Sequence, residues 1–455
     1  MECPPMRVLI AILAMFSLIL DSAEAANRPN IIVIVSDDCG FNEFSLSGAK
    51  TFPTPRIDSL AANGVLFKNG YVSGTVCSPS RAGLLTGRYQ NRFGHEFNIP
   101  AVFSEENGLP LTETTIADLL KETGYRTIAI GKWHLGYAPK FHPMERGFTD
   151  YYGFLQGSRS YWPVEKPSRL NQLLRDREPV RPEKFDYMTD ELGRAAVDYI
   201  AKHKADPFFM YLAFNATHSP MHALETDIEE AKKLSPEKVK LRAMALALDR
   251  AVGLVIDELT RQSLFDDTLL IFVNDNGGAT DRDNTPFRGH KGSTWEGGMR
   301  VMFAMQWPAV LPKGKVYEPP VIALDIFPTA MAAAGVATTR GKPLDGMKLD
   351  GVNLIPFLTG KETGRPHQAL FWKNGGKWAV RDGDLKLVAG NKETRTTKEQ
   401  TSPELYDLAS DVGEQKDLAG SRPADVERLR KMYEDWSRDF PRPLWGPQVE
   451  IEPAP

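Results

Sequence analysis

The chain contains a series of short apolar runs that each end in polar residues, and this pattern limits its fold more than any other feature. The run from Asn30 to Ser36 is rich in β-branched side chains and too short for a helix, which predicts a strand buried on both faces. Further runs of this kind lie at 127–130, 208–214 and 269–273. Segments with helical spacing alternate with them, at 54–60, 117–122, 190–203 and 239–259. The alternation predicts an α/β fold with a large, mostly parallel mixed sheet flanked by helices.

Polar side chains capable of chemistry directly follow four of the predicted strands. They are Asp37 and Asp38, then Lys132 and His134, then His218, and finally Asp275 and Asn276. In open α/β sheets ligands bind outside the carboxyl ends of the strands, so these segments are expected to line one crevice. Carboxylate and amide oxygens suit a hard divalent cation. Each segment alone is explained by a solvated turn, and only their combination indicates a site.

The first 25 residues have the features of a secretory signal peptide. Arg7 provides a positive flank, residues 8–20 form an apolar run, and Ala23-Glu24-Ala25 has the small-x-small form of a cleavage site. The run is shorter than the roughly 20 apolar residues that span a bilayer, which favours a cleaved signal over an anchor helix. We therefore expect an exported protein, periplasmic or secreted, with no stable membrane span.

The charge balance and the cysteines exclude several classes of protein. The chain has 55 Lys and Arg against 59 Asp and Glu, a net charge of −4, so no global field favours nucleic acid or an anionic membrane. Any anion-binding site must be local. Only Cys39 and Cys77 lie outside the predicted signal, which excludes a disulfide scaffold.

The pattern changes after about residue 346, where short runs and hairpin turns replace the strand and helix alternation. Strands are predicted at 369–372, 378–381, 385–388 and 404–408, with a helix at 424–440. We expect a catalytic α/β domain over residues 26–345. A small C-terminal subdomain, 346–455, would combine an antiparallel sheet with a helix.

The most specific stretch runs from Cys77 to Arg88 and reads Cys-Ser-Pro-Ser-Arg-Ala-Gly-Leu-Leu-Thr-Gly-Arg. A cysteine at the start of a helix could be an ordinary thiol nucleophile, with its thiolate stabilised by the helix N-terminus and by Arg81. A buried structural cysteine fits the same residues, because no acid flanks Cys77 and the sequence places no histidine beside it. The residues alone leave both interpretations open.

This stretch resembles the signature of the type I sulfatases, in the alkaline phosphatase superfamily, whose cysteine is oxidised after translation to formylglycine (3-oxoalanine). The resemblance covers nearly the whole mature chain, from Asp37-Asp38 to the segment 404–408. It implies a sulfuric ester hydrolase that is matured by a formylglycine-generating or an anaerobic sulfatase-maturing enzyme. It also implies a calcium ion held by Asp37, Asp38, Asp275, Asn276 and the modified Cys77.

The same resemblance assigns roles to the cationic side chains and the histidines. Arg81 would hold the formylglycine diol, while Lys132 and Lys291 would clamp the sulfate oxygens. His218 would protonate or polarise the leaving oxygen, and His134 would help to deprotonate the remaining hydroxyl.

The implied reaction is covalent. The hydrate at Cys77 attacks sulfur, the alcohol leaves, and the second hydroxyl expels sulfate to regenerate the aldehyde. Asp275 is a weaker candidate for accepting the proton of the attacking hydroxyl.

Three further features near these motifs need an interpretation. Cys39 stands where the family commonly has an apolar residue, and we interpret it as a small buried hydrophobe; a disulfide between Cys39 and Cys77 would block maturation. His218 and His222 have the spacing of a zinc-binding helix, but Pro220 lies between them, so we reject zinc. The glycosylation sequon at Asn215 lies in the predicted crevice and is interpreted as incidental.

Loops at 93–108, 156–182 and 279–288 are predicted to surround the mouth of the site. They carry His95, Arg159, Trp162 and Arg288, with His290 adjacent, and His95, Arg288 and His290 are the candidate substrate contacts. An exported enzyme with this polar and aromatic rim is expected to act on a sulfated small molecule, oligosaccharide or polysaccharide. Two alternatives remain: a phosphodiesterase or phosphonate-ester hydrolase of the same superfamily, and a non-catalytic calcium- and anion-binding homologue.

Overall fold

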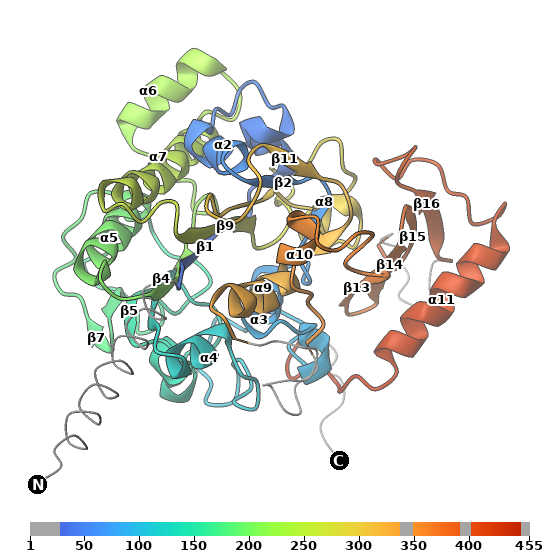
Figure 1. Ribbon diagram of the computed structural model, residues 1–455, viewed down its shortest axis with the longest axis horizontal. Helices are drawn as coiled ribbons and strands as arrows, with labels where there is room; N and C mark the ends of the chain where they lie inside the picture. Colours follow the sequence, from blue (N-terminus) through green and yellow to red (C-terminus); the bar gives the residue numbers. More distant parts are fainter. Residues whose placement is uncertain (1–27, 337–348, 392–401, 447–455) are drawn as a thin grey trace, which may run out of the picture.

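The computed structural model describes residues 28–336, 349–391 and 402–446. The predicted signal peptide and the predicted domain boundary at 345/346 lie outside these ranges. Figure 1 shows the α/β body that contains the central sheet and, beside it, the C-terminal sheet with its helix.

The central sheet of the described residues has ten strands in the order β11-β2-β10-β9-β1-β8-β4-β5-β6-β7. Its middle is parallel, and each strand of β9-β1-β8-β4-β5 pairs in parallel with the next. These strands are β1 (Asn30–Ser36), β4 (Arg126–Lys132), β5 (Asp150–Phe154), β8 (Phe208–Ala213) and β9 (Thr268–Asn274). The predicted mostly parallel mixed sheet is confirmed.

The outer strands complete the sheet with mixed directions. Strand β10 runs antiparallel to both β9 and β2, while β11 is parallel to β2. The outer strands are β2 (Val65–Phe67), β10 (Phe303–Gln306) and β11 (Lys315–Tyr317) on one side, and β6 (Leu174–Arg175) and β7 (Glu178–Pro179) on the other. A separate pair of strands joins β3 (Gly70–Tyr71) to β12 (Val321–Ile322).

Helices cover both faces of the sheet because successive side chains of a strand point to opposite sides. In β1, Ile31 and Val33 pack into one core cluster, and Ile32 and Ile34 into the other. The first cluster lies under α3 (Cys77–Thr86), α4 (Ile116–Glu122) and α9 (Ile326–Ala333), and the second under α2 (Pro55–Ala62), α5 (Met188–His203) and α7 (Val239–Arg261).

Further helical segments connect these elements. They are α6 (Glu225–Leu234), α8 (Glu296–Met299), α10 (Ile355–Leu358), and the 3₁₀ turns η1 (Phe41–Glu43), η2 (Ser45–Ser47), η3 (Gln90–Phe93), η4 (Pro139–Phe141), η5 (Pro143–Glu145) and η6 (Ala323–Asp325).

The start of α2 is capped by a tertiary contact. Pro55 occupies the first turn, and the Thr54 side chain makes no cap hydrogen bond to the helix. Instead the carboxylate of Asp249, on α7, accepts hydrogen bonds from the backbone amides of Arg56 and Ile57. A tertiary contact therefore satisfies the free amides that a local cap would otherwise bind.

The C-terminal sheet is antiparallel, as predicted, in the order β13-β14-β15-β16. Its helix α11 (Pro423–Ser437) packs on the sheet by burying Leu429 against Val380 and Leu387. The strands are β13 (Ala369–Asn374), β14 (Lys377–Asp382), β15 (Leu385–Ala389) and β16 (Glu404–Asp407).

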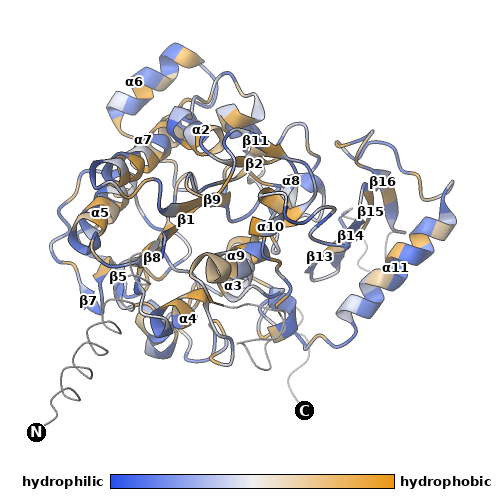
Figure 2. Cartoon of the chain, viewed as in Figure 1, coloured by the Kyte–Doolittle hydropathy of each residue, from blue (hydrophilic) through white to orange (hydrophobic). Residues whose placement is uncertain are grey.

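Hydropathy follows this architecture. The strands in the middle of the central sheet are orange in Figure 2, whereas the outer helices α6 and α11 carry blue turns toward solvent. Within the described ranges, no helix has the length and apolar character needed to cross a membrane.

Candidate active site

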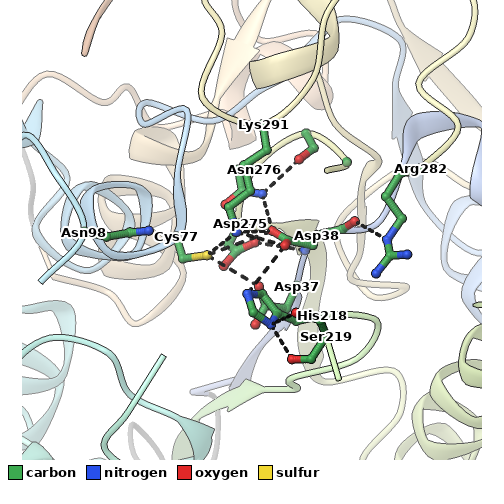
Figure 3. A network of polar contacts seen from close by, with 12 residues as sticks. Asp37, Asp38, Cys77, Asn98, His218, Ser219, Asp275, Asn276, Arg282 and Lys291 are labelled. Carbon is green, nitrogen blue, oxygen red and sulfur yellow. Dashed lines mark hydrogen bonds and ion pairs between the residues drawn. The ribbon is translucent and has the colours of Figure 1, made fainter. Parts of the chain in front are cut away.

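The carboxyl ends of four neighbouring parallel strands bring the predicted side chains together. Asp37 and Asp38 follow β1, Asp275 and Asn276 follow β9, His218 comes after β8, and Lys132 ends β4. Cys77, the first residue of α3, faces them across the crevice, as Figure 3 shows. The site is built where the fold class predicts it.

Oxygen atoms dominate the centre of the cluster. Ligand atoms of Asp37, Asp38, Cys77 and His218 all lie within 4.8 Å of one another. The amide nitrogen of Asn276 donates to Asp38 Oδ1 at 2.8 Å, while its Oδ1 is buried and has no hydrogen-bond partner in the described part of the chain. A buried oxygen without a donor, beside ionised carboxylates, fits a hard cation such as calcium.

The backbone fixes the direction of the carboxylates. Asp37 N–H donates to Ala216 O at 2.8 Å and Asp275 N–H to Ser36 O at 3.0 Å, so the residues after the strands continue the strand pairing. Asp38 then adopts a left-handed φ of 59°, which is uncommon for a residue with a side chain. The turn places Asp38 and Asp37 together against the cluster.

Three cationic side chains balance these acids. Lys132 Nζ lies 2.5 Å from Asp37 Oδ2, and Arg81 donates through Nε and NH2 to Asp275 Oδ2 at 3.0 and 2.8 Å. All four of these side chains are completely buried.

Lys291 is the more open of the two lysines, with its side chain 18% exposed. Its Nζ lies 2.6 Å from Asp38 Oδ1 and 3.1 Å from Cys77 Sγ. Lys291 thus joins the acidic cluster to the cysteine.

The surroundings shift the pKa values of two acids of the cluster in opposite directions. Burial would raise the pKa of Asp275, but Arg81 and Lys132 outweigh it and lower that pKa to about 2. Burial and the charge of Asp275 raise the pKa of Asp37, in spite of Lys132. A bound cation would oppose both of these influences on Asp37, which again favours a metal site.

The Cys77 thiol is not set up as an ordinary thiolate. Burial raises its pKa to about 12, and the charge of Asp275 adds to this shift although Lys132 and Lys291 oppose it. The thiol therefore stays protonated near neutral pH, and a protonated thiol is a poor nucleophile. The unmodified cysteine does not fit the role of a thiol nucleophile.

The two histidines differ in their surroundings. His134 is buried, and both burial and the charge of Lys132 lower its pKa well below the usual value, so its ring is neutral. His218 Nδ1 lies 2.7 Å from the carbonyl of Ser219, which can only accept, so Nδ1 carries a hydrogen. His218 Nε2 faces the cluster, 3.5 Å from Asp38 Oδ2.

Both described cysteines are free. Cys39 is buried beside Thr217, and burial raises its pKa to about 12, as expected for a small buried hydrophobe. Asn215, the sequon residue, is only 1% exposed, which agrees with its interpretation as incidental.

The candidate substrate residues lie in three different settings. His95 is fully buried, with Nε2 2.5 Å from Ser78 Oγ. Arg288 points to the C-terminal sheet, donating to Tyr406 OH at 3.1 Å, and its guanidinium lies over the Trp295 ring. His290 alone of the three is exposed, immediately before Lys291.

The other residues of the predicted rim also face inward. Arg159 is buried in an ion pair with Glu183 at 2.7 Å, and Trp162 stacks on His222 with ring centroids 5.9 Å apart. Both side chains are therefore engaged with other groups of the protein.

The sequence did not single out two residues that touch the site backbone. Tyr161 OH donates to the carbonyl of His218 at 2.9 Å, and Arg282 donates to the carbonyls of Asp38 and Thr217. Both lie in predicted rim loops, but side chains that bind backbone carbonyls leave no motif in a sequence.

Known proteins are similar to this chain in sequence and in fold. The family model described as Sulfatase matches residues 29–336. N-acetylgalactosamine-6-sulfatase of Canis lupus familiaris is 30% identical over 91% of this chain and 86% of its own length, and arylsulfatase A of Homo sapiens is 32% identical over 90% and 87%.

Among solved structures, Ps i-CgsB in complex with k-i-k-neocarrahexaose superimposes with a TM-score of 0.84. It is 34% identical in sequence and covers 93% of this chain and 96% of its own.

Proposed function

The chain belongs to the sulfatase family and is a sulfuric ester hydrolase, and we propose that it releases inorganic sulfate from a sulfated carbohydrate at a formylglycine made from Cys77. The observation that carries this proposal is the position of Cys77. It opens α3 within reach of Asp37, Asp38 and Lys291, and its own thiol is held protonated.

The carbohydrate substrate is supported by two kinds of relative. Ps i-CgsB, which is similar over nearly its whole length, binds k-i-k-neocarrahexaose. The canine relative is named for the 6-sulfate of N-acetylgalactosamine. We propose a sulfated oligosaccharide or polysaccharide as the substrate class, with exposed His290 as the nearest candidate contact outside the cluster.

Hydrated formylglycine supplies a hydroxyl group as the nucleophile, which the unmodified cysteine thiol cannot do. The residues around Cys77 suit such a group. Lys291 donates toward the Sγ position, and the carboxylates of Asp37 and Asp38 lie 3.6 and 4.0 Å from it. Arg81, anchored on Asp275, would bind the second hydroxyl.

Calcium, when bound, would neutralise the carboxylates and polarise the sulfate oxygens. Asp37, Asp38, Asp275 and Asn276 are the residues that would hold it, together with the modified Cys77. The unpartnered Asn276 Oδ1 supports this ligand set.

The remaining side chains act on charge and protons. Lys132 and Lys291 would each donate to sulfate oxygens, where negative charge is largest in the transition state. His218 would give the proton on Nε2 to the leaving oxygen, because Nδ1 is held by Ser219 O. His134, neutral and buried, would accept a proton when sulfate is expelled.

We further propose that the chain is exported by its N-terminal signal and acts in the periplasm or as a secreted enzyme. A formylglycine-generating or anaerobic sulfatase-maturing enzyme would be its processing partner. The buried position of Cys77 supports modification before folding is complete.

The direct test is a mass spectrum of the tryptic peptide Asn69 to Arg81, which contains Cys77. The protein would be made in a host that matures other sulfatases. We expect the mass of an aldehyde that is trapped by a hydrazine. An unmodified thiol in this host would contradict the proposal and favour a non-catalytic calcium- and anion-binding protein.

A second measurement separates sulfate from phosphate chemistry. A sulfate monoester, a phosphate diester and a phosphonate monoester each carry one negative charge near neutral pH, so the ratio of their kcat/KM values reports which transition state the site prefers. We expect kcat/KM for an aryl sulfate to exceed that for the matched phosphate diester and phosphonate ester. The reverse order would favour a phosphodiesterase or phosphonate-ester hydrolase.

A further inference from the structure

The segment Asn215–His218 carries a functional histidine, yet it belongs to neither a helix nor a strand. Its backbone is nevertheless held at every carbonyl. Ala216 O accepts from Asp37 N–H at 2.8 Å, and Thr217 O accepts from Arg282 NH2 at 2.7 Å. The carbonyls of Asn215 and His218 both accept from the single hydroxyl of Tyr161.

Tyr161 is itself rigidly placed. Its side chain is completely buried, and its carbonyl accepts a hydrogen bond from Met188 N–H, the first amide of α5, at 2.8 Å. Its ring stacks on Tyr187 with centroids 5.4 Å apart and an interplanar angle of 20°. A tyrosine fixed at both its backbone and its ring has little freedom to follow a moving partner.

The loop that carries Tyr161 also packs against the other histidine. His134 N–H donates to Leu155 O at 3.0 Å, and a Cβ built on Gly157 would lie only 2.5 Å from the His134 ring. The segment 155–161 therefore contacts the elements that carry both candidate proton-transfer groups.

Arg282 holds the opposite side of the same backbone. Its guanidinium donates to Thr217 O and, through Nε, to Asp38 O at 3.3 Å, as Figure 3 shows for Asp38. The His218 segment is thus fixed relative to the acidic cluster by Arg282 and relative to α5 by Tyr161. His218 Nε2 is left 3.5 Å from Asp38 Oδ2.

We propose that Tyr161 is a positioning residue for His218: its hydroxyl fixes the backbone carbonyls of Asn215 and of His218 itself, so that Nε2 meets the leaving oxygen of the sulfate ester. This inference rests on the proposed function, in which His218 protonates that oxygen. A displacement of about 1 Å in such a group is enough to cost about 10²-fold in rate.

Tyr161→Phe is the sharpest test because it deletes only the hydroxyl. Tyr187→Phe is the matched control, since Tyr187 stacks on Tyr161 and donates to His222 O at 2.9 Å, four residues beyond His218. Each variant would be assayed for kcat and KM on phenyl sulfate and on 4-nitrophenyl sulfate. Phenolate is the more basic leaving group, with a pKa of about 10, and needs the acid more.

We expect Tyr161→Phe to lower kcat on phenyl sulfate by about 10- to 100-fold, with a clearly smaller loss on 4-nitrophenyl sulfate and little change in KM. Tyr187→Phe should keep the wild-type ratio of the two substrates. Equal losses on both substrates, or identical behaviour of the two variants, would overturn the positioning role.

His218→Ala separates a failure of this inference from a failure of the proposed function. If His218→Ala slows phenyl sulfate selectively and Tyr161→Phe does not, the positioning role is wrong and the acid role stands. If His218→Ala slows neither substrate selectively, the acid role and the positioning role built on it are both overturned.

A second readout does not depend on turnover. The rate of diethylpyrocarbonate modification at His218, followed by mass spectrometry, reports how firmly the ring is held. We expect a several-fold faster reaction in Tyr161→Phe and a wild-type rate in Tyr187→Phe. An unchanged rate in Tyr161→Phe would contradict the inference, whatever the kinetics.

Discussion

Among the described residues, two buried clusters of charge differ in how their polar atoms are paired. The first is the acidic cluster of the active site. The second lies between the central body and the C-terminal sheet, where Lys386 on β15 is completely buried between Glu296 of α8 and Glu414, at 2.9 and 2.7 Å. Both clusters combine carboxylates with cations.

In the second cluster, called the closed cluster below, the Lys386 ammonium and both carboxylates are paired, and the unpartnered buried atom within the described ranges is a nitrogen, Arg300 Nε. Glu296 also accepts from Tyr71 OH at 2.6 Å and from Arg300, while Glu414 accepts from the backbone amide of Glu296. Buried ion pairs are stable only when such additional hydrogen bonds are present.

The active-site cluster, called the open cluster below, leaves some of its buried polar atoms without a partner among the described residues. Asn276 Oδ1 and His134 Nδ1 are buried and have no hydrogen-bond partner among the described residues, and Cys77 presents a protonated thiol. Unsatisfied buried groups cost free energy, which a ligand can recover on binding. The contrast lies in the kind of atom left unpaired: beside the active-site carboxylates it includes an oxygen, Asn276 Oδ1, which can bind a cation, whereas in the closed cluster it is the nitrogen donor of Arg300.

The largest expected effect is the loss of activity in Cys77→Ala. Removing the group that is converted to formylglycine should lower turnover by about 10⁴-fold or more. The thermal unfolding midpoint should stay close to the wild-type value, because the thiol is not part of a closed network of hydrogen bonds. Near-normal sulfate release by Cys77→Ala would refute the mechanism.

Lys386→Met tests the closed cluster. Removing the cation leaves Glu296 and Glu414 buried without it, which should lower the free energy of unfolding by about 3–5 kcal/mol. Turnover below the unfolding transition should remain close to wild type. Denaturant unfolding measures the loss, and Lys386→Met combined with Glu414→Leu should recover part of it. A cost below about 1 kcal/mol would remove the contrast between the clusters.

Lys291→Ala tests the open cluster at its most exposed cation. We expect a loss of about 10²–10³ in kcat, as for other donors to developing negative charge. Lys377→Ala is the matched control, because Lys377 Nζ donates to Gly292 O at 3.0 Å, one residue beyond Lys291. Steady-state kinetics on one sulfate ester should separate the two variants, and equal rates would contradict the assigned role.

Calcium should stabilise the protein through the open cluster alone. At a free concentration 100 times its Kd, the ion should add about 2.7 kcal/mol to the free energy of unfolding. Asn276→Ala should lose most of this increment, whereas Lys386→Met should keep it. Unfolding curves with calcium and with a chelator provide the measurement, and an equal increment in Asn276→Ala would argue against the ligand set.

The smallest effect concerns His95, beside the open cluster. Burial lowers the pKa of His95 to about 3, against about 6.5 in an unfolded chain. Between these values the unfolded state binds the proton and the folded state does not. The stability associated with neutral His95 is therefore complete above pH 6.5 and is lost as pH falls toward 3.

The loss should approach about 1.4 kcal/mol per pH unit at most. His95→Gln, which can still accept from Ser78, should be less destabilised between pH 7 and pH 5 than the wild type. Urea unfolding at both pH values checks this. Parallel pH dependence in the two proteins would mean that His95 is not held neutral.

Much of the fold could be predicted from local patterns. The runs at 127–130, 208–214 and 269–273 are observed as β4, β8 and β9, because a strand buried on both faces must be apolar throughout. The antiparallel C-terminal sheet was also predictable, since Asn374-Gly375-Gly376 and Asp382-Gly383 are turn residues at its hairpins. Strand β10, which runs antiparallel between β9 and β2, was not predicted, because direction is set by tertiary pairing.

The candidate site was likewise predictable only in part. The positions after the parallel strands identified Asp37, Asp38, Asp275 and Asn276 as neighbours, and the structure brings them together. Sequence reasoning placed His95 and Arg288 at an open rim, whereas the structure turns them toward Ser78 and Tyr406. Loop residues have no periodicity that would reveal which way they point.

The sequence by itself determined which strands are buried, where their polar ends gather and which signature Cys77 belongs to, because each depends on residues close together in the chain. Only the tertiary structure decided which charges are closed into pairs and which remain open. Lys386 meets Glu296 across 90 residues, and Tyr161 meets His218 across 57. Contacts over such separations depend on how the layers pack, and no local pattern records them.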